Sequence, residues 1–288
     1  MPKTNPTTLA RQLQDWSQRP SNERHYCTGQ LQQIDAALKD PRRGTQLAIG
    51  AYLLGVWYLA TGQDRVLRGK TDAWDEVRLG ASLQRVGLLL RAFSNRASQG
   101  GHQPRSRGRE DFADLPLLQG ANCVAICLSL DEPGAEPLYE CFRSLPDTRF
   151  GAADCWPLFV REIVSIRAGR RPTLTGRLGP YADIIRHWHG DLDLMARKMP
   201  ELLDLHLDRT QGKPGEPAEF EEPSVRLFPL EPRMLQAVRQ TLNLPTPKFD
   251  HSLCFTNLGI TSPRGPWPTD VVLTQLQAKL PRRARVRT

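Results

Sequence analysis

The chain has 288 residues, of which 39% are hydrophobic and 24% charged, and a formal net charge of +8, so it can bury a sizeable core in one large domain or two smaller ones. Its most apolar stretch, residues 47–60, is about 14 residues long, fewer than the roughly 20 that a membrane-spanning helix needs. No signal-peptide pattern precedes it, so we expect a cytoplasmic protein with no membrane partner.

The first third of the chain has the residue spacing of packed helices. Apolar residues three and four positions apart predict amphipathic helices over residues 7–18, 22–39 and 73–97. Between the last two lies a segment that is apolar on nearly all sides, and we expect a buried helix over residues 44–61 that ends at Gly62. The connections are short, which favours antiparallel hairpins.

A polar segment rich in glycine and arginine, residues 98–111, interrupts this pattern and predicts an exposed loop. It separates a possible helical layer over residues 1–98 from a second one over residues 112–280. The second layer begins with another nearly all-apolar helix, residues 115–130. Further helices are expected over residues 135–145, 154–169, 179–189, 191–208, 231–242 and 269–280.

Strict alternation of apolar and polar residues is almost absent, and only residues 225–230 could form a short extended segment. No fixed-period repeat stands out. We therefore predict an all-α fold, a single domain of about nine to eleven helices packed as antiparallel hairpins. A loop-rich C-terminal segment wraps over these helices in this prediction, and residues 281–288 form a disordered basic tail. Pro200 is expected to kink or divide its helix.

The strongest candidate for metal chemistry is the sequence HWHGDLD, which contains His187, His189, Asp191 and Asp193. On a helix, residues two positions apart point about 200° apart, so one metal ion cannot easily take both histidines. The other interpretation is a helix junction, with Trp188 packed inward and Asp191 capping the next helix. We favour the junction and expect no metal.

No motif for catalysis or cofactor binding stands out. The six cysteines are scattered, and only Cys123 and Cys127 are spaced so that they could share a metal, without a second pair to complete the site. Cys155 lies near a helix N-terminus, which would lower its pKa, but no histidine partner is identifiable. Nucleotide-cradling glycine motifs and G-x-S-x-G are absent. We expect no enzymatic activity, no cofactor and no small-molecule substrate.

Charge is unevenly distributed along the chain. Most of the positive excess lies in the segment 105–109 and in the tail, neither of which contains an aromatic residue that could stack on bases. The tail could touch nucleic acid or an acidic partner, but a solvated tail is the simpler interpretation. Residues 210–223 are rich in proline, glycine and glutamate and predict an exposed acidic loop.

The stretch FTNLGITSPRGPWPTD, residues 255–270, has two interpretations. An exposed Trp267 with Arg264 beside it would suit a partner-binding surface, because aromatic residues and arginine are enriched in binding hot spots. Alternatively, the segment wraps over the helices and inserts Phe255, Leu258 and Trp267 into their grooves. The two interpretations are compatible.

The polar helical start, the stretch LQQIDAALKDPRRGTQLAIGAYLLGVWYLATG and the closing FDHSLCFTNLGITSPRGPWPTD resemble the all-α immunity proteins that neutralise toxins of bacterial polymorphic and type VI secretion systems. The resemblance implies a protein that binds one cognate effector toxin and blocks it by occlusion. Toxin-binding residues vary within such families, so none is carried over here. Immunity proteins against nucleases are often acidic, whereas this chain is basic. Contact with a nuclease would then fall to the acidic segment 216–222 or to Asp191, Asp193, Asp204 and Asp208; otherwise the protein binds away from the active site of the nuclease.

These arguments lead to a set of candidate contact residues and two alternative functions. The candidates for toxin binding are Asp191, Asp193, Glu216, Glu219, Glu221, Glu222, Arg264 and Trp267. The main alternative is a helical scaffold or a nucleic-acid-associated protein that uses the basic tail. A third possibility is a helical metalloenzyme that uses His187 and His189.

Overall fold

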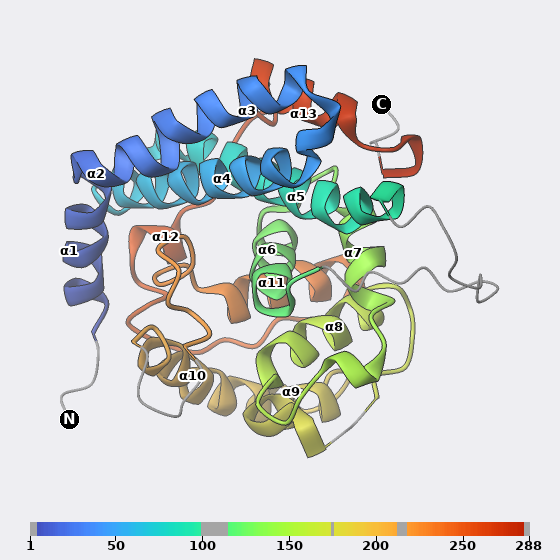
Figure 1. Cartoon of the computed structure of the whole chain (residues 1–288). Coiled ribbons are helices and arrows are strands. Elements are labelled where there is room, and N and C mark those ends of the chain that lie inside the picture. The colour runs from blue at the N-terminus through green and yellow to red at the C-terminus, as the bar shows by residue number, and fades with distance from the viewer. Residues whose placement is uncertain (1–4, 99–114, 174–175, 212–217, 285–288) are drawn as a thin grey trace.

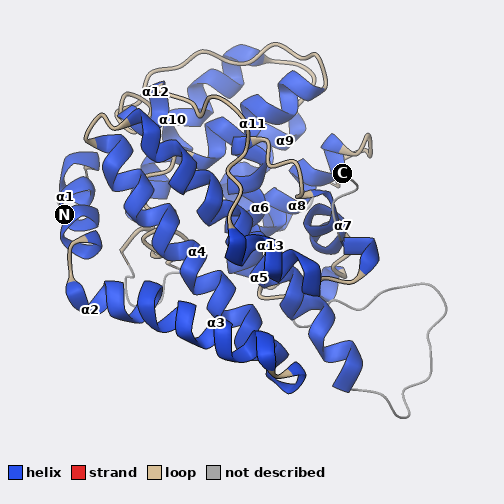
Figure 2. Ribbon diagram, turned by 90° about the horizontal axis from the view of Figure 1, so that it is seen from above, coloured by secondary structure: helices blue, strands red, loops and turns tan. Residues whose placement is uncertain are grey.

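The computed structural model describes residues 5–98, 115–173, 176–211 and 218–284, and these ranges are all-α without a β-strand (Figures 1 and 2). The predicted fold class is therefore confirmed. Within the same ranges, no helix combines the length and apolar composition needed to cross a membrane. The helices are α1 (Pro6–Ser17), α2 (Pro20–Glu23), α3 (Gly29–Lys39), α4 (Gly44–Leu67), α5 (Trp74–Ser98), α6 (Leu117–Leu130), α7 (Glu136–Arg143), α8 (Cys155–Arg167), α9 (Ala182–Arg186), α10 (Leu192–Asp208), α11 (Leu230–Thr241), α12 (Asn257–Ile260) and α13 (Val271–Lys279).

The helices form an upper layer of α3, α4 and α5 and a lower group of α8, α9 and α10, with α6 and α11 between them (Figure 1). The apolar helix α6 contacts α5, α7, α8 and α11, which explains why it has no polar face. Buried side chains of both predicted layers, from Leu9 to Ala284, belong to one hydrophobic core.

Glycines bring α4 and α5 into close contact along their length. A Cβ atom at Gly80 would lie 2.6 Å from the backbone nitrogen of Leu59, and one at Gly55 would lie 2.7 Å from the carbonyl oxygen of Gly80. Such distances are shorter than real Cβ contacts, so only glycine allows this approach. The two helices therefore pack backbone against backbone, and α4 is as buried as its sequence predicts.

The prediction that this helix ends at Gly62 is wrong, because α4 continues to Leu67. Gly62 faces α5, where an added Cβ would lie 2.9 Å from the backbone nitrogen of Val77. The chain turns only at Gly69, whose φ of +84° places it in the left-handed region that favours glycine. Gly62 is thus a helix-packing residue, and Gly69 is the one that ends the helix.

Two further local predictions differ from the structure. Residues 225–230 are not extended, because consecutive turns link Glu222 to Val225 and Val225 to Phe228 before α11 begins. Helix α10 is not divided at Pro200 but runs unbroken from Leu192 to Asp208. The helix predicted over residues 22–39 starts at Pro20 and contains one π-helical turn, Arg24–Thr28.

The C-terminal part of the chain crosses the helical layers and packs against α4 and α5. Helix α12 contacts α4, and α13 contacts α5. Leu280 and Ala284 are buried, and Arg282–Ala284 form one turn of 3₁₀ helix, so ordered chain extends past the predicted start of the tail. Residues 285–288 and the predicted loop over 99–111 lie outside the described residues.

Candidate functional site

The HWHGDLD sequence forms a helix junction. Trp188 is 1% exposed, and Asp191 caps α10 by accepting a hydrogen bond from the backbone nitrogen of Leu194 at 2.8 Å. Asp193 is exposed in the first turn of α10, where the helix dipole favours a carboxylate. The described part of the chain contains no group of three or more histidine, cysteine, aspartate or glutamate side chains placed to hold a metal.

The prediction of an exposed acidic loop over residues 210–223 is wrong for its described C-terminal half. The side chain of Glu219 is 3% exposed and forms an ion pair with Arg209 of α10. Burial raises the pKa of the Glu219 carboxyl above its ordinary value, and Arg209 acts in the opposite direction. Glu221 is exposed as predicted, whereas Glu216 lies outside the described residues.

Glu222 is a half-buried residue whose carboxylate points inward between α4 and α5. Tyr52 of α4 donates a hydrogen bond to Oε2 at 2.7 Å, and Gln84 of α5 donates one to Oε1 at 3.1 Å. Ser224 donates a further hydrogen bond to Oε1. These contacts fix the segment after residue 218 to the α4–α5 pair, which no local sequence pattern could reveal.

Three of the predicted contact residues do come together. Glu219, Glu221 and Glu222 line a polar hollow of about 420 Å³, opposite the aromatic side chains of Trp16 and Tyr26. Among the other predicted residues that the structure describes, Asp191, Asp193, Arg264 and Trp267, none lines this hollow. The structure therefore groups the acidic candidates without Asp191, Asp193, Arg264 or Trp267.

In the C-terminal segment, the exposure of two aromatic residues differs from what was predicted. The partner-binding interpretation expects an exposed Trp267, and the wrapping interpretation expects a buried Phe255. Trp267 is half-buried against the core and lies beneath the guanidinium of Arg78, 5.7 Å from the ring centre, so it is not freely exposed. Leu258 is fully buried, as the wrapping interpretation predicts. Phe255, which that interpretation places in a groove, is 61% exposed, and Ile260 is 64% exposed.

Side chains beneath the C-terminal segment hold its backbone in place. Arg233 of α11 donates hydrogen bonds to the carbonyl oxygens of Leu258 and Thr261. The indole nitrogen of Trp74 donates to the Thr261 hydroxyl at 3.0 Å. The side-chain amide of Asn257 donates to the carbonyl oxygen of Leu67 at 2.9 Å.

The same kind of contact continues toward Arg264. Arg78 of α5, only 3% exposed, donates to the carbonyl oxygens of Arg264 and Gly265, each at 2.9 Å. The guanidinium of Arg233 lies over the rings of Trp74 and Phe228, and its burial lowers its pKa to about 10. Buried arginines thus fix a surface segment that carries exposed apolar side chains and an exposed Arg264.

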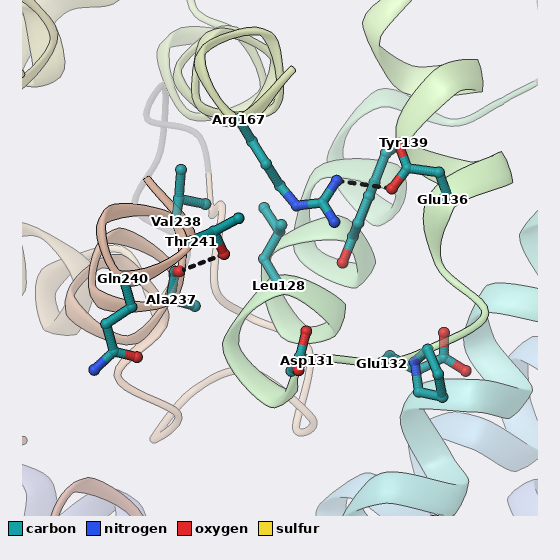
Figure 3. Close-up of a pocket in the computed structure, with 11 residues that line it drawn as sticks. Leu128, Asp131, Glu132, Glu136, Tyr139, Arg167, Ala237, Val238, Gln240 and Thr241 are labelled. Carbon is teal, nitrogen blue, oxygen red and sulfur yellow. Dashed lines mark hydrogen bonds and ion pairs between the residues drawn. The ribbon is translucent and has the colours of Figure 1, made fainter. Parts of the chain in front are cut away.

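A second polar hollow, of about 340 Å³, lies between the end of α6, α7, α8 and α11 (Figure 3). Arg167 points into it, pairs with Glu136 at 2.7 Å and lies 5.0 Å from the ring centre of Tyr139. Thr241 donates its hydroxyl to the carbonyl oxygen of Ala237. Because Arg167 and Glu136 already satisfy each other, this hollow offers little unpaired charge to a ligand.

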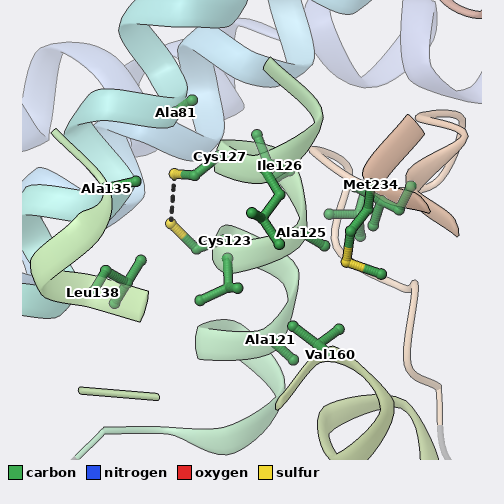
Figure 4. Close-up of a cluster of buried hydrophobic side chains, with 14 of the residues drawn as sticks. Ala81, Ala121, Cys123, Ala125, Ile126, Cys127, Ala135, Leu138, Val160 and Met234 are labelled. Carbon is green, nitrogen blue, oxygen red and sulfur yellow. Dashed lines mark hydrogen bonds between the residues drawn. The ribbon is translucent and has the colours of Figure 1, made fainter. Parts of the chain in front are cut away.

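The cysteines show no sign of reactivity. Cys123 and Cys127 lie on one side of α6 with their sulfur atoms 4.0 Å apart, inside the apolar core (Figure 4). The hydrogen bond between them and their burial raise the pKa of Cys127. Burial also raises the pKa of Cys155, followed by the nearby charge of Glu219, so the lowering expected from the helix N-terminus does not prevail.

Sequence reasoning missed a buried contact between a histidine and a carboxylate. His206 is fully buried, and its Nδ1 lies 3.0 Å from Glu231 of α11. The ring also stacks on Phe220, with 3.9 Å between centres. No periodicity argument distinguishes Glu231 from a solvent-facing glutamate, so only the packing of α10 on α11 reveals the pair.

Comparison with protein-family models, curated proteins and solved structures found no match for this chain. Any functional proposal therefore depends on the surface and the interior of the chain itself.

Proposed function

We propose that this chain is a non-enzymatic immunity protein that binds one cognate effector toxin in the cytoplasm and blocks it by occlusion. The observation that carries the proposal is the exposure of Phe255 and Ile260 at either end of α12, on a backbone held from below. Two such side chains on one short ordered segment can contribute to a contiguous apolar patch, the kind of surface that marks protein–protein contact.

The rigid backbone favours tight binding. Ordering a loop on association costs free energy, and a segment already held by Arg233, Trp74 and Asn257 avoids much of that cost. Phe255 offers aromatic contact area, and the exposed Arg264 offers hydrogen-bond donors in the same segment. We place the centre of the toxin contact on Phe255 and Ile260, which the sequence-based set of candidates does not include.

The exposed acidic residues would then contribute to association rather than to the centre of the contact. Glu221 and Asp193 are exposed and could attract a basic toxin surface, whereas Glu219 and Glu222 are occupied by contacts within the chain. Charges at the rim of an interface mainly change the association rate. A nuclease toxin, with its basic active-site surface, remains the preferred partner class within this proposal.

The direct test is co-expression with the product of the adjacent gene. We expect that product to arrest bacterial growth by itself and to be harmless when this chain is present. The proposal fails if the neighbouring product is not toxic, or if it stays toxic when this chain is produced in excess. A purified complex of the two proteins with a fixed stoichiometry would be the biochemical counterpart of growth rescue.

A further inference from the structure

A third hollow, of about 670 Å³, lies between the C-terminal ends of α8 and α11. Its lining differs from that of the two polar hollows, because it has an apolar floor with basic groups around it. Ile166, Pro172, Leu242 and Leu244 provide the apolar part. The basic and titratable part consists of Arg170, Arg171 and His189, all exposed.

The two arginines are held by a rigid turn. Gly169, with a φ of +73°, ends α8, and its backbone nitrogen donates to the carbonyl oxygen of Ile166 at 2.9 Å. The backbone nitrogen of Arg170 donates to Ser165 at 3.0 Å. The far end of the turn is fixed where the backbone nitrogen of Thr173 donates to the Glu162 carboxylate at 2.8 Å.

The other wall of the hollow is equally fixed. Helix α11 ends in a similar cap, in which Asn243 has a φ of +55° and the backbone nitrogen of Leu244 donates to the carbonyl oxygen of Arg239 at 2.8 Å. This cap places Leu242 and Leu244 on the hollow. Two caps therefore fix the backbone that carries the arginines and the leucines before any ligand arrives.

The charge at this hollow is uncompensated within the described part of the chain. No carboxylate there forms an ion pair with Arg170 or Arg171, unlike Arg167 one turn earlier, which pairs with Glu136. The ends of α8 and α11 each contribute a partial negative charge of about half an elementary charge. Two full guanidinium charges exceed that sum, so the hollow favours an anion.

We propose that this hollow is a binding site for a small amphiphilic anion, with a carboxylate or phosphate group on Arg170 and Arg171 and a short aliphatic chain over Ile166, Leu242 and Leu244. Small-molecule sites typically have volumes of about 300–1,000 Å³, a mostly apolar lining and a few placed polar groups. Guanidinium groups bind carboxylate and phosphate through paired hydrogen bonds, which explains the need for arginine at the rim. This site does not depend on toxin binding.

The test is calorimetric titration of the full chain with octanoate, below its micelle concentration. We expect saturable binding of octanoate, with acetate and octylammonium at least tenfold weaker, because acetate lacks the chain and octylammonium carries the wrong charge. Equal binding of octanoate and octylammonium, or no binding of octanoate, would overturn the proposal. Binding to phosphatidylglycerol vesicles without binding of monomeric octanoate would also overturn it, in favour of a membrane surface.

Variants connect the binding to the hollow. The double variant Arg170→Gln, Arg171→Gln should weaken octanoate binding at least tenfold, and Leu244→Ser should weaken it while leaving weak phosphate binding unchanged. Arg197→Gln is the matched control, since Arg197 is an exposed arginine of α10 outside the hollow, and it should bind like the parent chain. Octanoate binding that is retained in the double arginine variant would contradict the assignment. The unfolding curve of this variant shows whether a loss of binding is caused by a loss of the fold.

Discussion

His206 and Glu231 form a fully buried contact in which the imidazole Nδ1 lies 3.0 Å from the carboxylate. The other ring nitrogen, Nε2, lies 3.2 Å from the carbonyl oxygen of Val225. Both ring nitrogens therefore lie within hydrogen-bond distance of an oxygen acceptor. The pair joins α10 to α11 and to the turn before it, so it orders the region beneath the C-terminal segment.

Replacement of Glu231 by glutamine tests this contact. Glutamine places a neutral amide opposite Nδ1, and a weakened or unsatisfied buried hydrogen bond typically costs about 1–3 kcal/mol of unfolding free energy. We expect a loss of that size in urea unfolding. The control is Asp35→Asn, which breaks the exposed Lys39–Asp35 pair and should change stability little. Equal effects of the two variants would show that the buried contact between His206 and Glu231 adds little to stability.

Glu222 predicts a pH dependence of stability. Burial raises the pKa of its carboxyl above the ordinary value of 4.5, with its hydrogen bonds acting in the opposite direction. A folded-state pKa above the unfolded one means that the folded chain holds the proton more tightly, so this carboxyl lowers stability as pH rises above about 4.5. We therefore compare the free energy of unfolding of Glu222→Gln with that of the parent chain. From pH 4.5 to 7, the variant should become progressively more stable relative to the parent. If the unfolding free energies of the variant and the parent changed with pH in parallel, a raised pKa of Glu222 would be ruled out.

The close approach of α4 and α5 predicts that an added methyl group is destabilising. In Gly80→Ala, the new Cβ would meet the backbone nitrogen of Leu59 at 2.6 Å, so the helices must separate. Overpacking of this kind typically costs about 1–3 kcal/mol. Gly176→Ala is the matched control, because nothing lies within 4 Å of its added Cβ. Thermal unfolding of the two variants should differ by several degrees, and equal midpoints would mean that the helices are less tightly packed.

Arg233 predicts a local effect on the C-terminal segment. Arg233→Leu removes the donors to the carbonyl oxygens of Leu258 and Thr261 while keeping apolar contact with Trp74. We expect faster amide hydrogen exchange around α12 and weaker toxin binding, with little change in the exchange of α6. Uniformly faster exchange across the chain would instead show that Arg233 stabilises the whole fold rather than this segment.

Much of the fold follows from sequence periodicity, because helix identity depends on local spacing. The buried helix α6 and the paired α4 and α5 were all predictable from apolar content and caps. The end of α4 was not predictable, because Gly62 packs against α5. One sequence by itself does not distinguish a glycine that packs against a neighbouring helix from a glycine that ends its own helix.

The candidate site was less predictable, because exposure of single side chains depends on tertiary packing. Glu219 and Glu222 belong to a sequence that looks solvated, yet Arg209, ten residues from Glu219, and Tyr52 of the distant helix α4 hold them inward. Phe255 looks like a core residue and is exposed, since the turn around Leu258 buries only one side of the segment. Sequence patterns depend on the spacing of neighbouring residues. The burial of Glu219 and Glu222 and the exposure of Phe255 depend instead on contacts between separate structural elements.

The most direct test of the proposed function is the affinity of the purified chain for the product of the adjacent gene, which the proposal expects to be the toxin. The double variant Phe255→Asp, Ile260→Asp should weaken that affinity about 1,000-fold, since loss of two hot-spot residues costs about 2 kcal/mol each. Ile49→Asp is the control, because Ile49 is an exposed apolar residue of α4 about 27 Å along the helix from Leu67, where α12 is attached. Unchanged affinity in the double variant, with the control equally unaffected, would contradict the proposed contact.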